Sequence, residues 1–481
     1  MVSSPEYSID NALWLALIEV LVFISVVCRA GYVSLHMSFN IIVRKVLDGL
    51  RFAYLWSDLV ISGKFSSTLR MLDETPGRIA LFSWAVPPSK SAGVHRPLSL
   101  VQYAAGVGRR LTVFHGRTPE RHQIKGQAGI LVPGAEFVPV TELALAPPWR
   151  FVPQIDGGAL TAASFAKAAF QYYGDSPPDV VIASGPPFAM FVAASFCASK
   201  WERPLVLDYR DEWTECPFDF VEKGGENRIW EERVLTQAAL VVFTTVSMLA
   251  HALRSFPILR ADKCFVIPNG WDRTDFNSAK LNSSSTRSAD DGQFIISFIG
   301  NASGFADPTG FLVDLQEILE KYPKCRQWLK IRFVGQRSPS AAAALANFAY
   351  PCNVEVIDHV PKVQAIRHML DADALLLITS SNGERSQASK LFEYVASKKP
   401  VLIYGAKGES ERALNDLGVG HFVAAGDNET LCDLICSWRE KGGGDGFLSK
   451  GTRIDEWLDR HERGNLSLLF LEQMDHFCVR A

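Results

Sequence analysis

Short apolar runs alternate with amphipathic stretches along most of this chain, beginning near Gly77. The apolar runs are rich in β-branched and aromatic residues, which is typical of strands, and apolar residues recur at the helical period between them. Strands that alternate with helices predict parallel sheets. The expected strands form two series, first at 79–84, 111–115, 180–183, 204–208, 240–244 and 265–268, and then at 294–299, 329–334, 354–357, 374–379, 401–404 and 421–424.

Helices are expected between these strands, and two stretches interrupt the pattern. Residues 118–152 are rich in Pro and Gly and have no clear period, whereas 277–292 (NSAKLNSSSTRSADDG) is polar and Ser-rich, as linkers are. The expected helices are 98–106, 165–173, 189–199, 229–238, 247–255, 311–321, 341–348, 363–370, 388–397, 411–417, 431–439 and 454–477.

The pattern therefore predicts an α/β protein with two Rossmann-like domains that face each other across a cleft. Ligands of open parallel sheets bind beyond the carboxyl ends of the strands, so we expect function in the loops that follow them. The predicted parts are a helical extension, a first domain, a linker, a second domain and a C-terminal helical segment, at 1–75, 76–276, 277–292, 293–440 and 441–481.

The N-terminal extension contains an apolar run, Ala12–Cys28, which is interrupted by Glu19. Its length is borderline for a spanning helix, and a carboxylate in mid-bilayer costs about 2–3 kcal/mol. Basic residues follow the run, so an inserted helix would leave the rest of the chain in the cytoplasm. We favour membrane association over a pair of helices packed on the body or on a partner subunit, and place true spanning behind both.

Composition narrows the classes of partner and cofactor. The 481 residues carry a formal net charge of −3, which does not suggest nucleic-acid binding. The nine cysteines are scattered, and Cys432 and Cys436 have no further Cys or His at ligand spacing. We expect reduced intracellular thiols, with neither a disulfide framework nor a metal site.

A polar loop at 380–387 follows the expected strand 374–379 and leads into a helix that carries Lys390 and Glu393. Backbone N–H groups at the start of that helix suit a diphosphate, Lys390 adds a charge, and Glu393 can accept hydrogen bonds from a ribose diol. The alternative is an exposed salt bridge between residues three apart, worth a few tenths of a kcal/mol. The position after a strand end favours the binding site.

Five segments, in chain order, resemble the retaining glycosyltransferases of the GT-B fold, often called group 1 or family 4. The segment at 389–405 (SKLFEYVASKKPVLIYG) resembles the C-terminal donor-binding signature, in which a glutamate grips the ribose. The other four resemble the first strand and its Gly-containing loop, the SGPP motif, the D-[FY]-R-D-x-W motif and the PNG-x-D turn, at 80–96, 184–187, 207–213 and 266–272.

The chain departs from this family at two places. Members often have two glutamates in an E-x7-E pattern that ends at Glu393, but the first position is Arg385 here, and Glu384 is one residue away. A basic residue that many members carry after the first strand of the second domain is missing from 300–307. Phosphate charge would then be met by Lys390, with Arg385 and backbone N–H groups.

The resemblance implies a glycosyltransferase that moves a sugar from a nucleoside-diphosphate sugar to an acceptor hydroxyl, with retention and without a further cofactor or metal. A glycan or lipid-linked glycan acceptor is expected, with the protein in the cytoplasm or on the cytoplasmic face of a membrane. The implied catalytic residues are Asp211, Arg210 and Glu384, and the implied donor-binding residues are Glu393, Lys390, Gly93, Arg96, Arg385 and Leu391.

Three alternatives stay open from the sequence. A sugar-nucleotide 2-epimerase would share the fold, and a non-catalytic sugar-nucleotide-binding scaffold would fit the two departures. A membrane-tethered interaction protein fits less well, because it has no use for Lys390 and Glu393. Around Asp208, Arg210 and Asp211, an internal ion pair that shapes the loop has nearly the same weight as contact with an acceptor.

Overall fold

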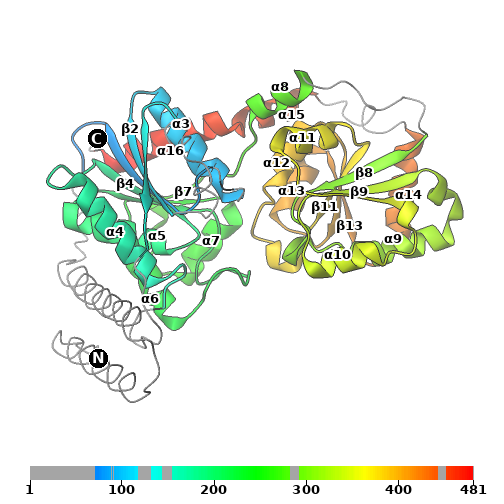
Figure 1. The fold of residues 1–481 in the computed structure, drawn as a ribbon, viewed down its shortest axis with the longest axis horizontal. Helices are drawn as coiled ribbons and strands as arrows, with labels where there is room; N and C mark the ends of the chain where they lie inside the picture. Colours follow the sequence, from blue (N-terminus) through cyan, green and yellow to red (C-terminus); the bar gives the residue numbers. More distant parts are fainter. Residues whose placement is uncertain are drawn as a thin grey trace, which may run out of the picture. The chain divides into compact units, whose positions relative to one another are not determined.

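The computed structural model describes residues 71–87, 89, 92–116, 132–142, 154–281, 292–441 and 451–479. These residues form two compact units, each built on one sheet (Figure 1). The predicted membrane-associated run Ala12–Cys28 and most of the 1–75 extension lie outside the described residues. In the part of the chain that is described, no helix has the length and apolar character needed to cross a bilayer.

The first unit contains a seven-stranded sheet with the strand order β3-β2-β1-β4-β5-β6-β7. Neighbouring strands from β3 to β6 pair in parallel, as the alternation of strands and helices predicted. The strands are β1 (Arg78–Ser83), β2 (Arg110–Gly116), β3 (Ala135–Val140), β4 (Val180–Gly185), β5 (Leu205–Tyr209), β6 (Leu240–Phe243) and β7 (Cys264–Val266), and the helices are α3 (His95–Gly106), α4 (Ala159–Tyr173), α5 (Ala189–Trp201), α6 (Gly225–Gln237) and α7 (Val246–Ser255).

Strand β3 is an element that the sequence did not predict. It lies at the edge of the sheet, most of its residues are only partly buried, and it contains Pro139. An edge strand tolerates proline because one side of its backbone needs no sheet partner. The usual strand signal, a buried apolar run without proline, is therefore absent from residues 118–152.

The second unit contains a six-stranded parallel sheet with the order β10-β9-β8-β11-β12-β13. Its first three strands have the predicted bounds. The strands are β8 (Phe294–Ile299), β9 (Leu329–Val334), β10 (Val354–Ile357), β11 (Ala374–Ile378), β12 (Val401–Gly405) and β13 (Gly420–Ala424), and the helices are α9 (Thr309–Lys321), α10 (Pro339–Ala346), α11 (Lys362–Leu370), α12 (Lys390–Ala396), α13 (Glu409–Leu417) and α14 (Asn428–Glu440).

Two hydrophobic clusters, one on each face, hold this second sheet. Successive strand residues point to opposite faces, so Leu376 joins one cluster with α9, α10 and α14, while Leu375 and Leu377 join the other with α11, α12 and α13. Burial on both faces explains why the central strands β8, β11 and β12 read as nearly continuous apolar runs. It also leaves only the strand ends open to ligands.

The strand order reverses direction between β8 and β11, and this is where a ligand is expected. The loops after these strands are therefore adjacent at the carboxyl edge of the sheet. Gly335, which follows β9, has a φ of 134°, and a Cβ at that position would collide with the carbonyl oxygen of Gly300, which follows β8. Glycine at 335 allows the two loops to approach closely.

The boundaries of the domains differ from the prediction. The second unit begins at Val266 rather than at 293, and it also contains residues 244–251. Helix α8 (Arg273–Leu281) occupies the start of the predicted linker. The predicted C-terminal segment is also divided, because residues to Phe470 belong to the second unit and the residues from Leu471 belong to the first. The predicted boundaries relied on a polar stretch of sequence, and the polarity of a segment does not show which unit a neighbouring helix packs on.

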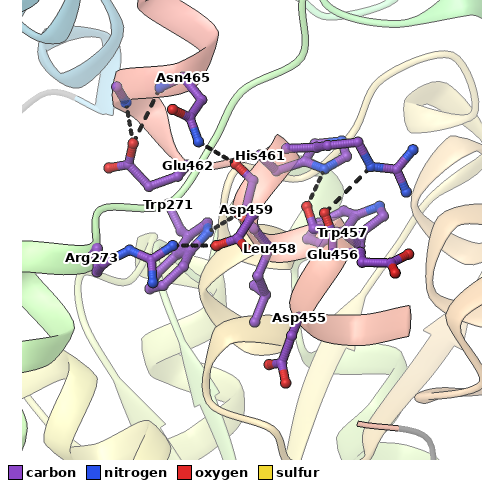
Figure 2. A network of polar contacts seen from close by, with 12 residues as sticks. Trp271, Arg273, Asp455, Glu456, Trp457, Leu458, Asp459, His461, Glu462 and Asn465 are labelled. Carbon is purple, nitrogen blue, oxygen red and sulfur yellow. Dashed lines mark hydrogen bonds and ion pairs between the residues drawn. The ribbon is translucent and has the colours of Figure 1, made fainter. Parts of the chain in front are cut away.

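The single C-terminal helix expected at 454–477 is two helices, α15 (Gly451–Arg460) and α16 (Arg463–Cys478). The chain turns between them at Glu462, which precedes α16 and caps its start. Its carboxylate accepts hydrogen bonds from the backbone N–H groups of Gly464 at 2.6 Å and Asn465 at 3.2 Å (Figure 2). The Asn465 side chain also donates to the Asp459 carbonyl at 2.6 Å, which closes the turn. An acidic residue suits this position at a helix start.

Candidate functional site

The predicted charge pair lies where β11 ends. The chain leaves β11, makes the short 3-10 turn η7 (Ser381–Gly383) and enters α12, whose first residue is Lys390. The helix has only seven residues, three fewer than predicted for 388–397. A dipole from so short a helix is small, so side-chain charges dominate the electrostatics here.

Glu393 is buried, with 3% of its surface exposed, and it is surrounded by cations. One carboxylate oxygen accepts a hydrogen bond from Lys390 Nζ at 2.7 Å, and the other is in contact with Lys362 Nζ. Arg463 Nη2 lies 4.0 Å from the carboxylate. The pair is therefore not the exposed salt bridge that was the alternative interpretation.

These charges keep Glu393 ionised. Burial by itself would raise the pKa of its carboxyl group, but the charges of Lys390 and Lys362, with their hydrogen bonds, outweigh burial and lower the pKa to about 2. Burial lowers the pKa of Lys362, against the opposing effect of Glu393. The result is a buried anion that is paired on both oxygens and lies at the carboxyl edge of the sheet.

Lys362 and Arg463 were not predicted as site residues. Lys362 is the first residue of α11, directly after the loop that follows β10, so its position after a strand end was a usable signal. Arg463 could not have been found in this way. It reaches Glu393 because the C-terminal helices dock on the second unit, a contact between distant parts of the sequence.

The PNG-x-D turn positions Arg463. Trp271 donates its backbone N–H to the His461 carbonyl at 3.1 Å and its indole N–H to the Leu458 carbonyl at 2.8 Å, and it accepts the Arg463 N–H at 2.9 Å. A Cβ at Gly270 would lie 2.5 Å from the His461 carbonyl oxygen, so glycine is needed for this docking. Figure 2 shows Trp271 and Arg273 facing α15. The turn thus has a packing role beyond a simple chain reversal.

The other predicted residues of this unit are less involved. Glu384 is exposed, and its backbone carbonyl accepts the Glu409 N–H at 2.8 Å. Arg385 is half-buried in the same loop. Leu391 is fully buried in the hydrophobic cluster, and its N–H donates to the Ala388 carbonyl at 3.0 Å. The side chain of Leu391 therefore packs in the core and supports α12.

In the first unit, Asp208 is the penultimate residue of β5 and binds Arg96. The Nε of Arg96 lies 2.9 and 3.1 Å from the two carboxylate oxygens, and Ser184 donates its hydroxyl to Asp208 at 2.8 Å. The internal ion pair that was considered for this loop thus exists, but its cation is Arg96 rather than Arg210. Arg96 is held by a carboxylate instead of being directed at a phosphate.

Arg210 is bound to backbone carbonyl groups. Its guanidinium donates to the Gly93 carbonyl at 2.7 Å, to the Gly185 carbonyl at 3.2 Å and to the Pro186 carbonyl. A Cβ on Gly93 would collide with this guanidinium. Gly93 was predicted to bind the donor, and in this structure the space beside it is filled by the Arg210 guanidinium. Burial lowers the pKa of Arg210. Burial also raises the pKa of Asp211, while the charge of the neighbouring Arg210 acts to lower it.

Glu231 on α6 holds the loop after β5. It is buried and accepts hydrogen bonds from Tyr209 Oη at 3.2 Å and from Thr214 N at 2.9 Å. Burial raises its pKa to about 7, although these hydrogen bonds oppose the change. Trp213, in the same loop, is fully buried and donates to Asn227 at 2.9 Å. Glu231 and Asn227, both on α6, therefore hold the loop that carries Arg210 and Asp211.

Comparison with known proteins gives the wider context. Residues 72–270 match the family model of the glycosyl transferase 4-like domain. No curated protein matches the sequence significantly. Anabaena HepE with UDP is similar in structure, with 15% identity and a TM-score of 0.55 over 83% of this chain and 100% of that one. Sucrose-phosphate synthase from Thermosynechococcus elongatus has 14% identity and a TM-score of 0.61 over 83% of this chain and 98% of its own. An E. coli trehalose-6-phosphate protein bound with UDP-2-fluoro glucose has 12% identity and a TM-score of 0.61 over 83% of this chain and 99% of its own. At these identities the structural likeness establishes the fold.

Proposed function

We propose that this chain, a GT-B-fold glycosyltransferase whose residues 72–270 form a glycosyl transferase 4-like domain, transfers a sugar from a nucleoside-diphosphate sugar to an acceptor hydroxyl. The group that carries the proposal is the Glu393 carboxylate with its two lysines, Lys390 and Lys362. It lies at the carboxyl edge of the second sheet, beside the reversal of strand order.

The cluster suits a donor that carries both a diol and a diphosphate. An ionised carboxylate accepts hydrogen bonds from two ribose hydroxyl groups. Once the diol occupies Glu393, the lysine Nζ groups are available to a diphosphate a few bonds away. Both lysine side chains are partly exposed, at 28% for Lys390 and 23% for Lys362, so a ligand can reach them. Lys362 would supply the positive charge that residues 300–307 lack.

The chemical step in this proposal is sugar transfer with retention of the anomeric configuration. Lys390 and Lys362 would stabilise negative charge on the departing diphosphate, which increases as the glycosidic bond breaks. Acceptor binding belongs to the first unit, where Asp211 follows β5. Arg210, whose guanidinium is bound to three carbonyl groups, would position this loop rather than contact the sugar.

The donor panel should begin with UDP-sugars. HepE was solved with UDP and with UDP-glucose, and the E. coli relative in fold was bound with UDP-2-fluoro glucose. For the acceptor we propose a glycan or lipid-linked glycan at the cytoplasmic face of a membrane. This part of the proposal rests on the polysaccharide-type motifs at 184–187 and 207–213 and on the apolar run at 12–28.

The decisive assay measures release of free nucleoside diphosphate from a panel of nucleotide sugars, with and without candidate acceptors. Wild type and Glu393→Gln should differ, whereas the matched variant Glu320→Gln, on the exposed surface of α9, should behave as wild type. Turnover that survives Glu393→Gln unchanged would contradict the site.

A non-catalytic sugar-nucleotide-binding scaffold is the second candidate, since residues 300–307 carry no basic side chain. It predicts that Glu393→Gln weakens donor binding while no donor and acceptor pair gives turnover. Interconversion of a nucleotide sugar without an acceptor would favour the epimerase alternative instead. Product analysis of the same reactions by NMR separates the three outcomes.

A further inference from the structure

Three cysteines that are far apart in the sequence meet in the second unit. The sulfur atoms of Cys325, Cys432 and Cys436 all lie within 4.8 Å of one another. The sequence suggested scattered thiols without a metal site, because Cys432 and Cys436 have no third ligand nearby in the chain. The fold supplies the third thiol from another element, which spacing alone could not reveal.

Local structure explains why the three sulfurs converge. Cys432 and Cys436 are four residues apart on α14, so they project from one face of the helix. Cys325 lies on the 3-10 helix η5 (Pro323–Gln327), directly after α9, and α9 packs against α14. All three are free thiols. Cys325 and Cys432 are buried at 5% exposure each, and Cys436 is half-buried, which gives the cluster an opening to solvent.

The cluster matches the size of a three-sulfur metal site. A metal ion about 2.3 Å from each of three sulfurs in a plane needs the sulfurs about 4.0 Å apart. Side-chain movements of less than about 1 Å would bring the present arrangement to that spacing. Within the described residues, no fourth Cys, His, Asp or Glu joins the group. The protein therefore offers three ligands, where a structural zinc site has four.

We infer that Cys325, Cys432 and Cys436 bind one Cu(I) ion through three sulfurs. Thiolates are soft ligands and select Cu(I) over hard, hydrated divalent ions, and three ligands fall short of the four that a structural zinc site takes. On binding, each thiol loses its proton to water as a Cu–S bond forms, and no oxidant or reductant is consumed when the metal is supplied as Cu(I).

The surroundings offset part of the negative charge that three thiolates bring. Burial raises the pKa of Cys325 to about 11 and that of Cys432 to about 12. Arg439 lies over the ring of Trp328 at 4.1 Å, and its charge acts to lower the pKa of Cys325. A bound ion would join η5 to α14 and so stabilise this end of the second unit.

The test is an anaerobic titration of the reduced full-length protein with Cu(I), in competition with a chromophoric Cu(I) chelator. Wild type should retain one Cu(I) per chain, and Cys325→Ser, Cys432→Ser and Cys436→Ser should each lose it. Cys352→Ser removes an exposed thiol outside the cluster and should bind as wild type. Cu(I) should also raise the thermal unfolding temperature by several degrees in wild type and Cys352→Ser only.

Cys436→Ser is the key variant, because Cys436 is the least buried of the three and its loss should not prevent folding. Nucleoside-diphosphate binding provides a separate check that each variant is folded. Wild type that takes up no Cu(I), or Cys436→Ser that retains it as wild type does, would overturn the inference. Uptake of Zn(II) without uptake of Cu(I) would overturn the choice of metal.

Discussion

Removing the charge of Glu393 should change the pH dependence of stability in the second unit. In the folded chain its pKa is about 2, against an ordinary value of 4.5. This difference corresponds to about 3 kcal/mol of folding free energy when the carboxylate is ionised. Because the folded pKa is lowered, the contribution is fully present above pH 4.5 and is lost as the pH falls toward 2.

In Glu393→Gln that contribution disappears at every pH. The variant should therefore be about 3 kcal/mol less stable than wild type at pH 6–7, because Lys362 and Lys390 remain without their counter-ion. The difference should shrink steadily below pH 4.5. The other carboxyl groups titrate in both proteins, so their contributions to the free energy of unfolding cancel when the two proteins are compared at the same pH.

Hydrogen exchange followed by mass spectrometry suits this measurement, because it reports on β11, β12 and α12 separately from the first unit in the intact chain. Glu320→Gln serves as the control and should track wild type at every pH. A wild-type-minus-variant difference that stays constant from pH 7 to pH 3 would refute the reasoning, since it would mean that the Glu393 carboxyl has an ordinary pKa in the folded protein.

Three further variants test other parts of the account. Lys362→Met should raise the Kd for a nucleoside diphosphate roughly tenfold to a hundredfold by calorimetry, as expected for loss of one charged hydrogen bond, and an unchanged Kd would remove Lys362 from the site. Asp208→Asn should destabilise the first unit by about 3 kcal/mol in urea, because it removes the buried carboxylate that pairs with Arg96 at 2.8 Å; an unaltered midpoint would mean that the pair is dispensable. Gly270→Ala should lower the free energy of unfolding by roughly 1–3 kcal/mol and increase hydrogen exchange in α15, because the new Cβ lies 2.5 Å from the His461 carbonyl oxygen. Amide protection in α15 equal to that of wild type would show that the turn adapts to the new side chain.

The central strands β8, β11 and β12 of the second sheet were predictable because they are buried on both faces. Phe294–Ile299 has the predicted bounds because its nearly continuous apolar run coincides with a fully buried strand. Leu329–Val334 and Val354–Ile357 instead alternate apolar and charged residues, and this period of two predicted them. Strand β3 escaped prediction for the opposite reason, being an edge strand with partly buried residues and a proline. The edge strand β10 is also only partly buried, but it has no proline and keeps its alternation, so it was predicted.

The site was predictable only in part. Lys390 and Glu393 share a helix, so their proximity is local and readable from spacing. Lys362, Arg463 and the Cys325 thiol come from distant segments, and their positions depend on how α11, α16 and η5 pack. The contact between Gly93 and Arg210 could not be predicted either, because spacing does not show that the guanidinium occupies the space beside the glycine.

A crystal structure of the chain with a nucleoside diphosphate is the most direct test of the central claim. The account predicts that both ribose hydroxyl groups donate hydrogen bonds to the Glu393 carboxylate, and that Lys390 and Lys362 have turned toward the diphosphate. A nucleotide bound elsewhere, with the Glu393 carboxylate still paired to both lysines, would contradict it.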